Sequence, residues 1–190
     1  MGLLPSLYRV VLKQQQPLLK AWEAEYDHPV FSFQAGKNSL HQIWQQAAAA
    51  EWAVNSRSAE SASRKLHTGM VLWDLTDYYE NVGASLRQRE VDLAFPIPVA
   101  TLDIQQYGGH RLLQHGQAVA SCSYPTHGIV AGCTAATYHV QAYSGPGLSK
   151  FIHTHHHLAL NVHVDDLCNS AIDKQEDKVV QHLVAGARDP

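Results

Sequence analysis

The chain is poor in cysteine, in charged residues and in long apolar runs, and each shortage excludes a class of protein. Its three cysteines, Cys122, Cys133 and Cys168, are an odd number without the spacing of a metal site, which indicates reduced thiols rather than a disulfide framework. No apolar run is long enough for a membrane-spanning helix, and the N-terminal segment lacks the layout of a signal peptide. We therefore expect an intracellular protein of the cytoplasm or nucleus, neither secreted nor partnered with a membrane.

Charge of either sign is scarce as well. Only 16% of the 190 residues are charged, and the formal net charge is −3. Because nucleic-acid-binding surfaces are usually basic, this balance does not by itself indicate a nucleic-acid partner. The hydrophobic fraction of 45% is that of a folded protein, and the length suffices for one domain with its own core.

Apolar periodicity and capping signals predict helices that alternate with strands. Helical spacing, bounded by proline, glycine and capping residues, predicts helices at 3–12, 18–25, 38–54, 80–94 and 134–143, and a last helix that starts at a capping box of Asp173 and Glu176 and stops at Gly186. We expect the third of these, and the four tryptophans, to pack in the core, and Gly145-Pro146-Gly147 to end the fifth helix. Extended runs predict strands at 70–75, 157–165 and 167–171, and a hairpin at 111–123 around Gly116. Hairpins pair antiparallel, so the fold class is α+β, a layered antiparallel sheet packed with helices.

Two of the predicted strands end in aspartates. The run from His157 to Leu167 alternates apolar and polar residues and carries Asp165 and Asp166 at its end, and the apolar strand from Met70 to Trp73 is followed by Asp74. A strand that buries one face and then presents carboxylates places charge where water or a cation must compensate it. The two strands therefore predict one shared divalent-metal site.

Three segments around these strands carry a family resemblance. They are VLWDLTDYYENV at 71–82, THGIVAGCTAAT at 126–137 and HVDDL at 163–167. Their order and spacing resemble motifs A, B and C of reverse transcriptases. The segments at 3–10 and 33–46 are similar to fingers segments of these enzymes, the second in its non-LTR retrotransposon form, so the resemblance covers essentially the whole chain.

The resemblance implies a fold and a metal chemistry. Residues 1–66 would be a partial fingers segment, and residues 67–190 a palm with its antiparallel sheet. In-line attack of a primer hydroxyl on a triphosphate uses two Mg²⁺ (or Mn²⁺) ions that clamp the attacking and leaving oxygens. By resemblance, Asp74, Asp165 and the carbonyl of Leu75 would bind these ions, and Asp166 would be the second acid of the hairpin.

The resemblance also implies substrate contacts and partners. Tyr79 would lie under the incoming sugar, Gly128 would let the backbone approach the templating pair, and an RNA template, a DNA primer and dNTPs would be the partners. The chain departs from the family at His163, at His127 and at Gly132-Cys133. Because the family's fingers cations would precede Met1 and its thumb would follow Pro190, we expect a core fragment of a longer polyprotein, inactive as an isolated chain.

Simpler interpretations of the same residues stay open. Asp165 and Asp166 could form a polar hairpin turn, Asp74 could cap a strand end, and Gly128 could be a turn glycine. Asp77 is read as a helix N-cap, and the histidines at 153–157 as a solvated loop and strand start rather than a zinc site. The alternative functions are a catalytically dead palm-like module that binds nucleic acid or has a structural role, and a non-polymerase metallohydrolase.

Overall fold

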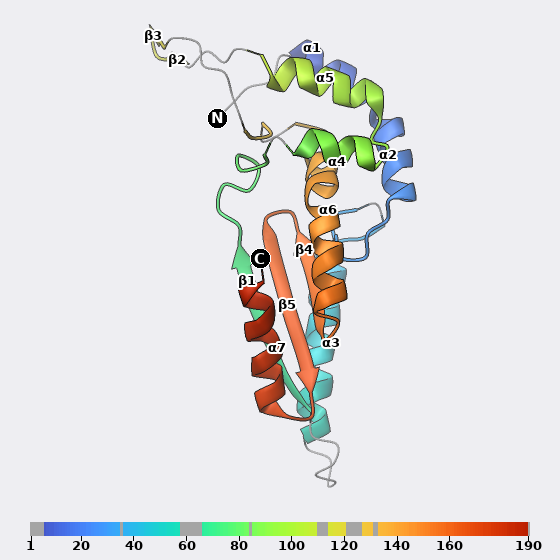
Figure 1. Ribbon diagram of the computed structural model, residues 1–190, viewed down its shortest axis with the longest axis vertical. Coiled ribbons are helices and arrows are strands. Elements are labelled where there is room, and N and C mark those ends of the chain that lie inside the picture. Colours follow the sequence, from blue (N-terminus) through green and yellow to red (C-terminus); the bar gives the residue numbers. More distant parts are fainter. Residues whose placement is uncertain are drawn as a thin grey trace. The chain divides into compact units, whose positions relative to one another are not determined.

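The computed structural model describes residues 6–34, 36–57, 66–83, 85–109, 114–120, 127–130 and 133–189. The chain forms two compact units (Figure 1), and each unit combines two distant segments: Met1–Asp27 with Asp77–Ser144, and His28–Thr76 with Gly145–Pro190. These units do not coincide with the predicted boundary between residues 66 and 67, because sheet pairing joins the middle of the chain to its C-terminal part. The helices and the antiparallel sheet confirm the α+β class, while the naming of fingers and palm stays a prediction.

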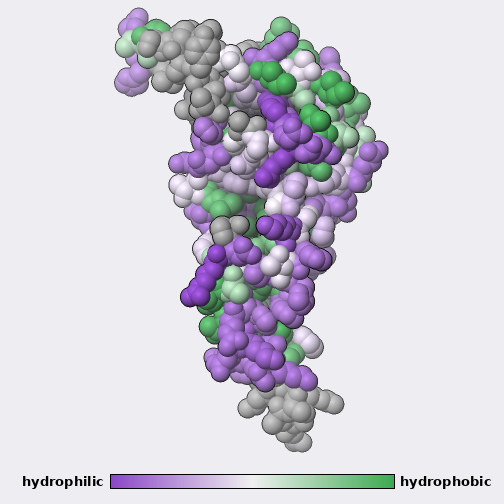
Figure 2. Space-filling model, in the orientation of Figure 1, coloured by the Kyte–Doolittle hydropathy of each residue, from purple (hydrophilic) through white to green (hydrophobic). Residues whose placement is uncertain are grey.

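The first unit is helical around one apolar core. Leu12, Leu19, Val99 and Val140 come from four different helices and are fully buried in it. Figure 2 shows hydrophobic patches dispersed among hydrophilic ones where these helices lie, as is usual for single exposed apolar residues. The unit contains α1 (Ser6–Gln14), α2 (Gln16–Glu25), α4 (Leu86–Asp92), α5 (Ile97–Tyr107), the first half of α6 (Ala136–Thr154) and the hairpin β2 (Gln114–His115) and β3 (Ala118–Val119).

The second unit is built on a three-stranded antiparallel sheet. Its strands β1 (His67–Asp74), β5 (Asp166–Asp173) and β4 (Leu158–His163) lie in the order β1-β5-β4. The predicted alternation is confirmed: Leu158, Leu160 and Val162 are buried, and the residues between them are more exposed. Helix α7 (Glu176–Arg188) and the second half of α6 cover this buried face, and the outer surface of α7 is largely hydrophilic (Figure 2).

Glycine allows α7 to approach the sheet closely. A Cβ atom on Gly69 of β1 would lie 2.8 Å from Leu183 Cδ1 and 2.9 Å from Val179 Cγ1. Both contacted side chains belong to α7, and Val179 packs with Leu158 and Ala171 in the core of this unit. Because Gly69 has no side chain, α7 can lie this close to β1.

Several sequence-based boundaries are wrong, for identifiable reasons. Helix α6 continues through Gly145-Pro146-Gly147, because Leu148, Phe151 and Ile152 beyond it pack on the sheet and outweigh the local cost of proline. The helix predicted from 80 is shorter and begins at Leu86, so Asp77 is in a turn rather than at an N-cap. Helix α7 passes Gly186, which is buried beside Leu158 and Phe151.

The third helix packs with the opposite face from the one predicted. Of the four tryptophans, Trp22 is in the core as expected, whereas Trp44, Trp52 and Trp73 are exposed. Asn38 caps α3 (Ser39–Arg57) as predicted, since its Oδ1 accepts a hydrogen bond of 2.7 Å from the His41 amide.

No helix among the described residues has the length and apolarity needed to cross a bilayer.

Candidate acid site at the sheet edge

The acidic residues that end the two predicted strands are brought together at one end of the sheet. Asp74 on β1 is the direct partner of Asp166 on β5, and Asp166 is in turn the partner of His163 on β4. Cα atoms of directly opposed residues in antiparallel strands lie about 4.5–5.5 Å apart. Asp74, Asp166 and His163 therefore form a row across three strands, with their side chains on the same face of the sheet.

The turn between β4 and β5 carries Asp165. Only Val164 and Asp165 separate the two strands, and Val164 has a positive φ of 59°. Such a conformation is a strained one for a β-branched residue, and glycine usually occupies it in two-residue hairpins. The Leu75 amide donates a hydrogen bond of 3.1 Å to the Asp165 carbonyl, which fixes this turn to the end of β1.

The loop segment at residues 30–32 pairs with β4, the first strand of the hairpin. Phe31 forms a parallel bridge with Val162, whose amide donates to the Val30 carbonyl at 2.8 Å. Ser32 donates its amide to the Val162 carbonyl at 3.0 Å, and its hydroxyl lies 2.8 Å from His163 Nδ1. The His163 ring, next to the acids, is therefore fixed by a buried serine.

The carboxylates suit a hard cation with a partly aqueous coordination shell. Asp74, Asp165 and Asp166 are all exposed, and Mg²⁺ usually keeps several waters beside one or two protein carboxylates. The register places Asp74 opposite Asp166, with Asp165 in the adjoining turn. Within the described ranges, no three His, Cys, Asp or Glu side chains converge on one point. A hard cation at this end of the sheet would therefore be held by fewer than three of these side chains, with water completing its coordination shell.

Of the three residues assigned to substrate, Leu75 belongs to the second unit, and Tyr79 and Gly128 belong to the first, where their loops are hydrogen-bonded together. Ile129 donates its amide to the Tyr79 carbonyl at 2.7 Å, and Gly128 donates its amide to the Val82 carbonyl at 2.9 Å. Gly128 has a φ of 93°, and a Cβ atom there would lie 3.1 Å from the Glu80 carbonyl oxygen. A glycine is therefore required by the backbone. Thr126, Ala131 and Gly132 of motif B lie outside the described residues.

A small cavity lies beside Gly128. Its volume is about 340 Å³, and its lining includes Arg87, Tyr107, His127 and Gly128 together with aliphatic side chains. The cavity lies wholly within the first unit. Its lining thus combines a few polar side chains with a larger number of apolar ones.

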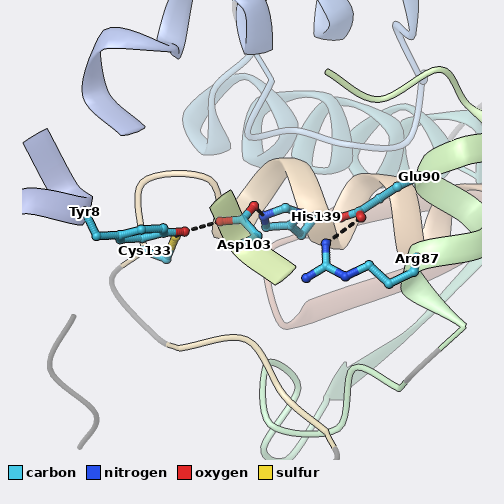
Figure 3. A network of polar contacts seen from close by, with 6 residues as sticks. All are labelled: Tyr8, Arg87, Glu90, Asp103, Cys133 and His139. Atoms are coloured by element: carbon cyan, nitrogen blue, oxygen red, sulfur yellow. Dashed lines mark hydrogen bonds and ion pairs between the residues drawn. The ribbon is translucent and has the colours of Figure 1, made fainter. Parts of the chain in front are cut away.

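A buried network of charges in the first unit escaped the sequence analysis (Figure 3). His139 is fully buried, with Nδ1 2.6 Å from Glu90 Oε1 and Nε2 2.5 Å from Asp103 Oδ2. Arg87 Nη1 lies 2.6 Å from Glu90 Oε2, and the Tyr8 hydroxyl donates to Asp103 Oδ1. Two buried carboxylates are thus compensated by one imidazole, one guanidinium and one phenol.

The electrostatics of this network follow from its burial. Burial disfavours a charged imidazole, but the hydrogen bonds and negative charges of Asp103 and Glu90 outweigh it and raise the pKa of His139. Burial, followed by the hydrogen bond to Asp103, raises the pKa of Tyr8, which remains a protonated donor. Since Asp103, Glu90 and His139 are shielded from solvent, the network has a structural role. No sequence signal indicates it, because Tyr8, Glu90, Asp103 and His139 are far apart along the chain.

The histidine cluster begins with His153 in the last turn of α6 and continues at 155–157 as a turn that leads into β4. His157 is exposed, and its ring lies at a tilt to those of His156 and His182, with centroid distances of 3.8 Å and 4.5 Å. Desolvation, followed by the charges of these two rings, lowers the pKa of His157. His155 Nε2 lies 3.0 Å from Asp189 Oδ2. The interpretation of the cluster as a solvated loop agrees with the turn at 155–157, but His153 is helical and β4 begins only at Leu158.

Comparisons of the chain with protein-family models, with curated proteins and with solved structures find no match.

Proposed function

We propose that this chain is the palm and part of the fingers of a reverse transcriptase that uses two metal ions for nucleotidyl transfer. The observation that carries the proposal is the register of β1 and β5. Asp74, from the segment similar to motif A, is paired with Asp166, from the segment similar to motif C, although about 90 residues separate them. The resemblance assigns roles to Asp74, Asp165 and Asp166, and the register supports it by setting Asp166 opposite Asp74, with Asp165 in the adjoining turn.

The turn geometry is a second support. A valine with positive φ costs about 1–2 kcal/mol relative to an ordinary conformation. Strain of this kind is often found where a side chain must be held at a functional site. Here the strained residue directly precedes Asp165, and the Leu75 amide holds the turn against β1.

The roles follow from ordinary carboxylate chemistry. Asp74 and Asp165 bind the metal ions together with the Leu75 carbonyl, and Asp166 adds negative charge beside them. Bound Mg²⁺ or Mn²⁺ would stabilise the charge that develops on the attacking and leaving oxygens. Tyr79 and Gly128, held together by their loops, contact the sugar and the templating pair. An RNA template, a DNA primer and dNTPs are the partners.

Metal binding provides the direct test. Water-proton relaxation with Mn²⁺ should reveal binding in the intact chain that is lost in the Asp74→Asn, Asp165→Asn double variant. Asp177→Asn is the matched control, because Asp177 is an exposed acid on the first turn of α7. Mn²⁺ binding that is equal in all three proteins would contradict the proposal.

Catalysis requires a second measurement. Extension of an RNA-templated DNA primer should be measured with this chain joined to any adjoining fingers and thumb segments of its gene. We expect extension that depends on Asp74 and Asp165. Mn²⁺ binding without extension in such a protein would favour the catalytically dead palm-like module.

A further inference from the structure

Histidine side chains gather at the end of the sheet opposite to the candidate acid site. His157 directly precedes β4, and Asp173 ends β5, whereas Asp74 and Asp166 are paired at the other end of the sheet. Asp173 is seven residues beyond Asp166 along β5, a distance of about 23 Å at 3.3 Å per residue. The histidines and the candidate acid site are therefore too far apart to share one ion.

Helix α7, which runs alongside β5 (Figure 1), adds a histidine to those of the turn before β4. Its position is fixed by packing, since Val179 is buried against Leu158, and a Cβ atom on Gly186 would lie 2.5 Å from Leu158 Cδ1. His182 lies between Val179 and Gly186 along α7. Its ring is thereby brought beside that of His157, with 4.5 Å between the ring centroids.

The ring distances select one pair of these histidines as metal ligands. Since imidazole nitrogens bind Zn²⁺ at about 2.0–2.1 Å, two imidazoles on one ion have ring centroids roughly 4.4–5.2 Å apart. His157 and His182 fit this range at 4.5 Å, whereas His156 and His157 are too close, at 3.8 Å. His155 is directed elsewhere, because its Nε2 lies 3.0 Å from Asp189 Oδ2.

The electrostatic surroundings keep this pair available to a cation. Desolvation, followed by the charges of His156 and His182, lowers the pKa of His157 and favours the neutral imidazole that binds metals. Asp173 places a negative charge near both rings of the pair, and its Oδ1 accepts a hydrogen bond of 2.9 Å from the N-cap amide of α7. Lys178 is the positive charge near His157. With the imidazoles neutral, the charges of Asp173 and Lys178 cancel.

We propose that His157 and His182 bind one Zn²⁺ ion, with water in its remaining coordination positions. Imidazole suits Zn²⁺, whereas carboxylates suit Mg²⁺ and Mn²⁺, so the two ends of the sheet would select different ions. Among the described residues, no third His, Cys, Asp or Glu converges with the pair. The site therefore differs from a closed structural zinc site of four protein ligands. A bound ion would join the turn before β4 to α7.

The first test measures Zn²⁺ binding by calorimetry on the full chain, with its thiols kept reduced. The intact chain should bind one Zn²⁺ at micromolar concentration. His157→Gln and His182→Gln should each weaken binding by about tenfold or more, because even the loss of an outer partner of a metal ligand usually costs about 10–100-fold. Circular dichroism verifies that each variant is folded.

The matched control is His153→Gln. His153 is exposed in the last turn of α6, so this change removes one histidine from the contiguous run and leaves the proposed pair intact. Its affinity for Zn²⁺ should equal that of the intact chain. No binding by the intact chain, or equal weakening by His153→Gln and His182→Gln, would overturn the proposal. Equal affinity in all the variants would assign Zn²⁺ to other groups, such as the thiols, and would refute it as well.

A second test counts the ligands directly. Cu²⁺ binds the same donors as Zn²⁺, and nitrogen couplings in the electron paramagnetic resonance spectrum of bound Cu²⁺ report its imidazole ligands. Two imidazoles should be seen in the intact chain and one in His182→Gln. The Asp74→Asn, Asp165→Asn double variant should keep both, which separates this site from the candidate acid site. Couplings that His182→Gln leaves unchanged would contradict the proposal.

Discussion

Asp74 and Asp166 are directly opposed on β1 and β5, so that two carboxylates from distant parts of the chain share one rung of an antiparallel ladder. Like charges at directly opposed positions destabilise a sheet. A protein without a use for this pair would gain stability by changing either residue. Without a bound cation, the pair should therefore lower the free energy of unfolding, and this decrease can be measured.

We predict that Asp74→Asn stabilises the metal-free chain, by less than about 1 kcal/mol, because it removes the cross-strand repulsion. Urea denaturation in the presence of EDTA would measure the gain. Raising the ionic strength should shrink the difference, since exposed charges are screened. A loss of stability in the variant would show that Asp74 has a favourable partner.

The turn at Val164 provides the second prediction. Val164→Gly should raise the free energy of unfolding by about 1 kcal/mol, because glycine adopts positive φ without a clash. Val164→Ala is the control, since it shortens the side chain but keeps the Cβ atom that causes the strain. Stabilisation by alanine as large as that by glycine would place the cause in the side chain rather than the backbone.

The third prediction concerns pH. The pKa of His139 is raised in the folded chain, so its contribution to stability is complete below the ordinary histidine value of about 6.5 and is lost as pH rises through the folded pKa. His139→Gln should therefore cost most at mildly acidic pH, about 3–5 kcal/mol, because it leaves Asp103 buried without a cation and Glu90 with Arg87 alone.

The measurement is urea denaturation of both proteins from pH 5.5 to pH 9. His115→Gln, on the exposed β2–β3 hairpin, is the matched control and should show no such pH dependence. A cost of His139→Gln that grows with rising pH would reverse the sign and refute the charged network.

Gly128 gives the fourth prediction. Gly128→Ala should destabilise the chain by about 1–3 kcal/mol, because its φ of 93° is unfavourable for a residue with a Cβ atom and the Glu80 backbone lies too close. Gly147→Ala provides a contrast, since that glycine lies within α6 with no atom near its Cβ position. This second change should stabilise by up to about 1 kcal/mol through helix propensity. Melting temperatures of the two variants should move in opposite directions.

Local signals predicted the elements whose stability is itself local. Pro17 at the start of α2, Asn38 at the start of α3 and the alternation along β4 were sufficient to predict those elements. Helix α5 was missed, because Pro96 and Pro98 were read as a stop although proline is well suited to a first helical turn. Pro146 was likewise interpreted as the end of a helix, although α6 continues through it.

The candidate site was predicted only in part, because only some of its features are local in the sequence. Aspartates at strand ends are visible in sequence, but the pairing of Asp74 with Asp166 depends on strand register. The charged side chains around His139 are brought together by tertiary packing, so no pattern in the sequence indicates them. The orientation of α3 could not be foreseen either, because its periodicity shows an apolar side without showing which side faces the sheet.

The interleaving of the two units has a consequence for how the protein is made. During synthesis, β1 leaves the ribosome about 90 residues before its partner β5, an interval of about 5–20 seconds at the usual rate of translation. Throughout that interval the sequence His67–Asp74 has hydrogen-bonding groups and apolar residues without their sheet. A nascent chain stalled before residue 166 would therefore be a substrate for chaperones and prone to aggregate, until β5 and α7 emerge and pack with β1.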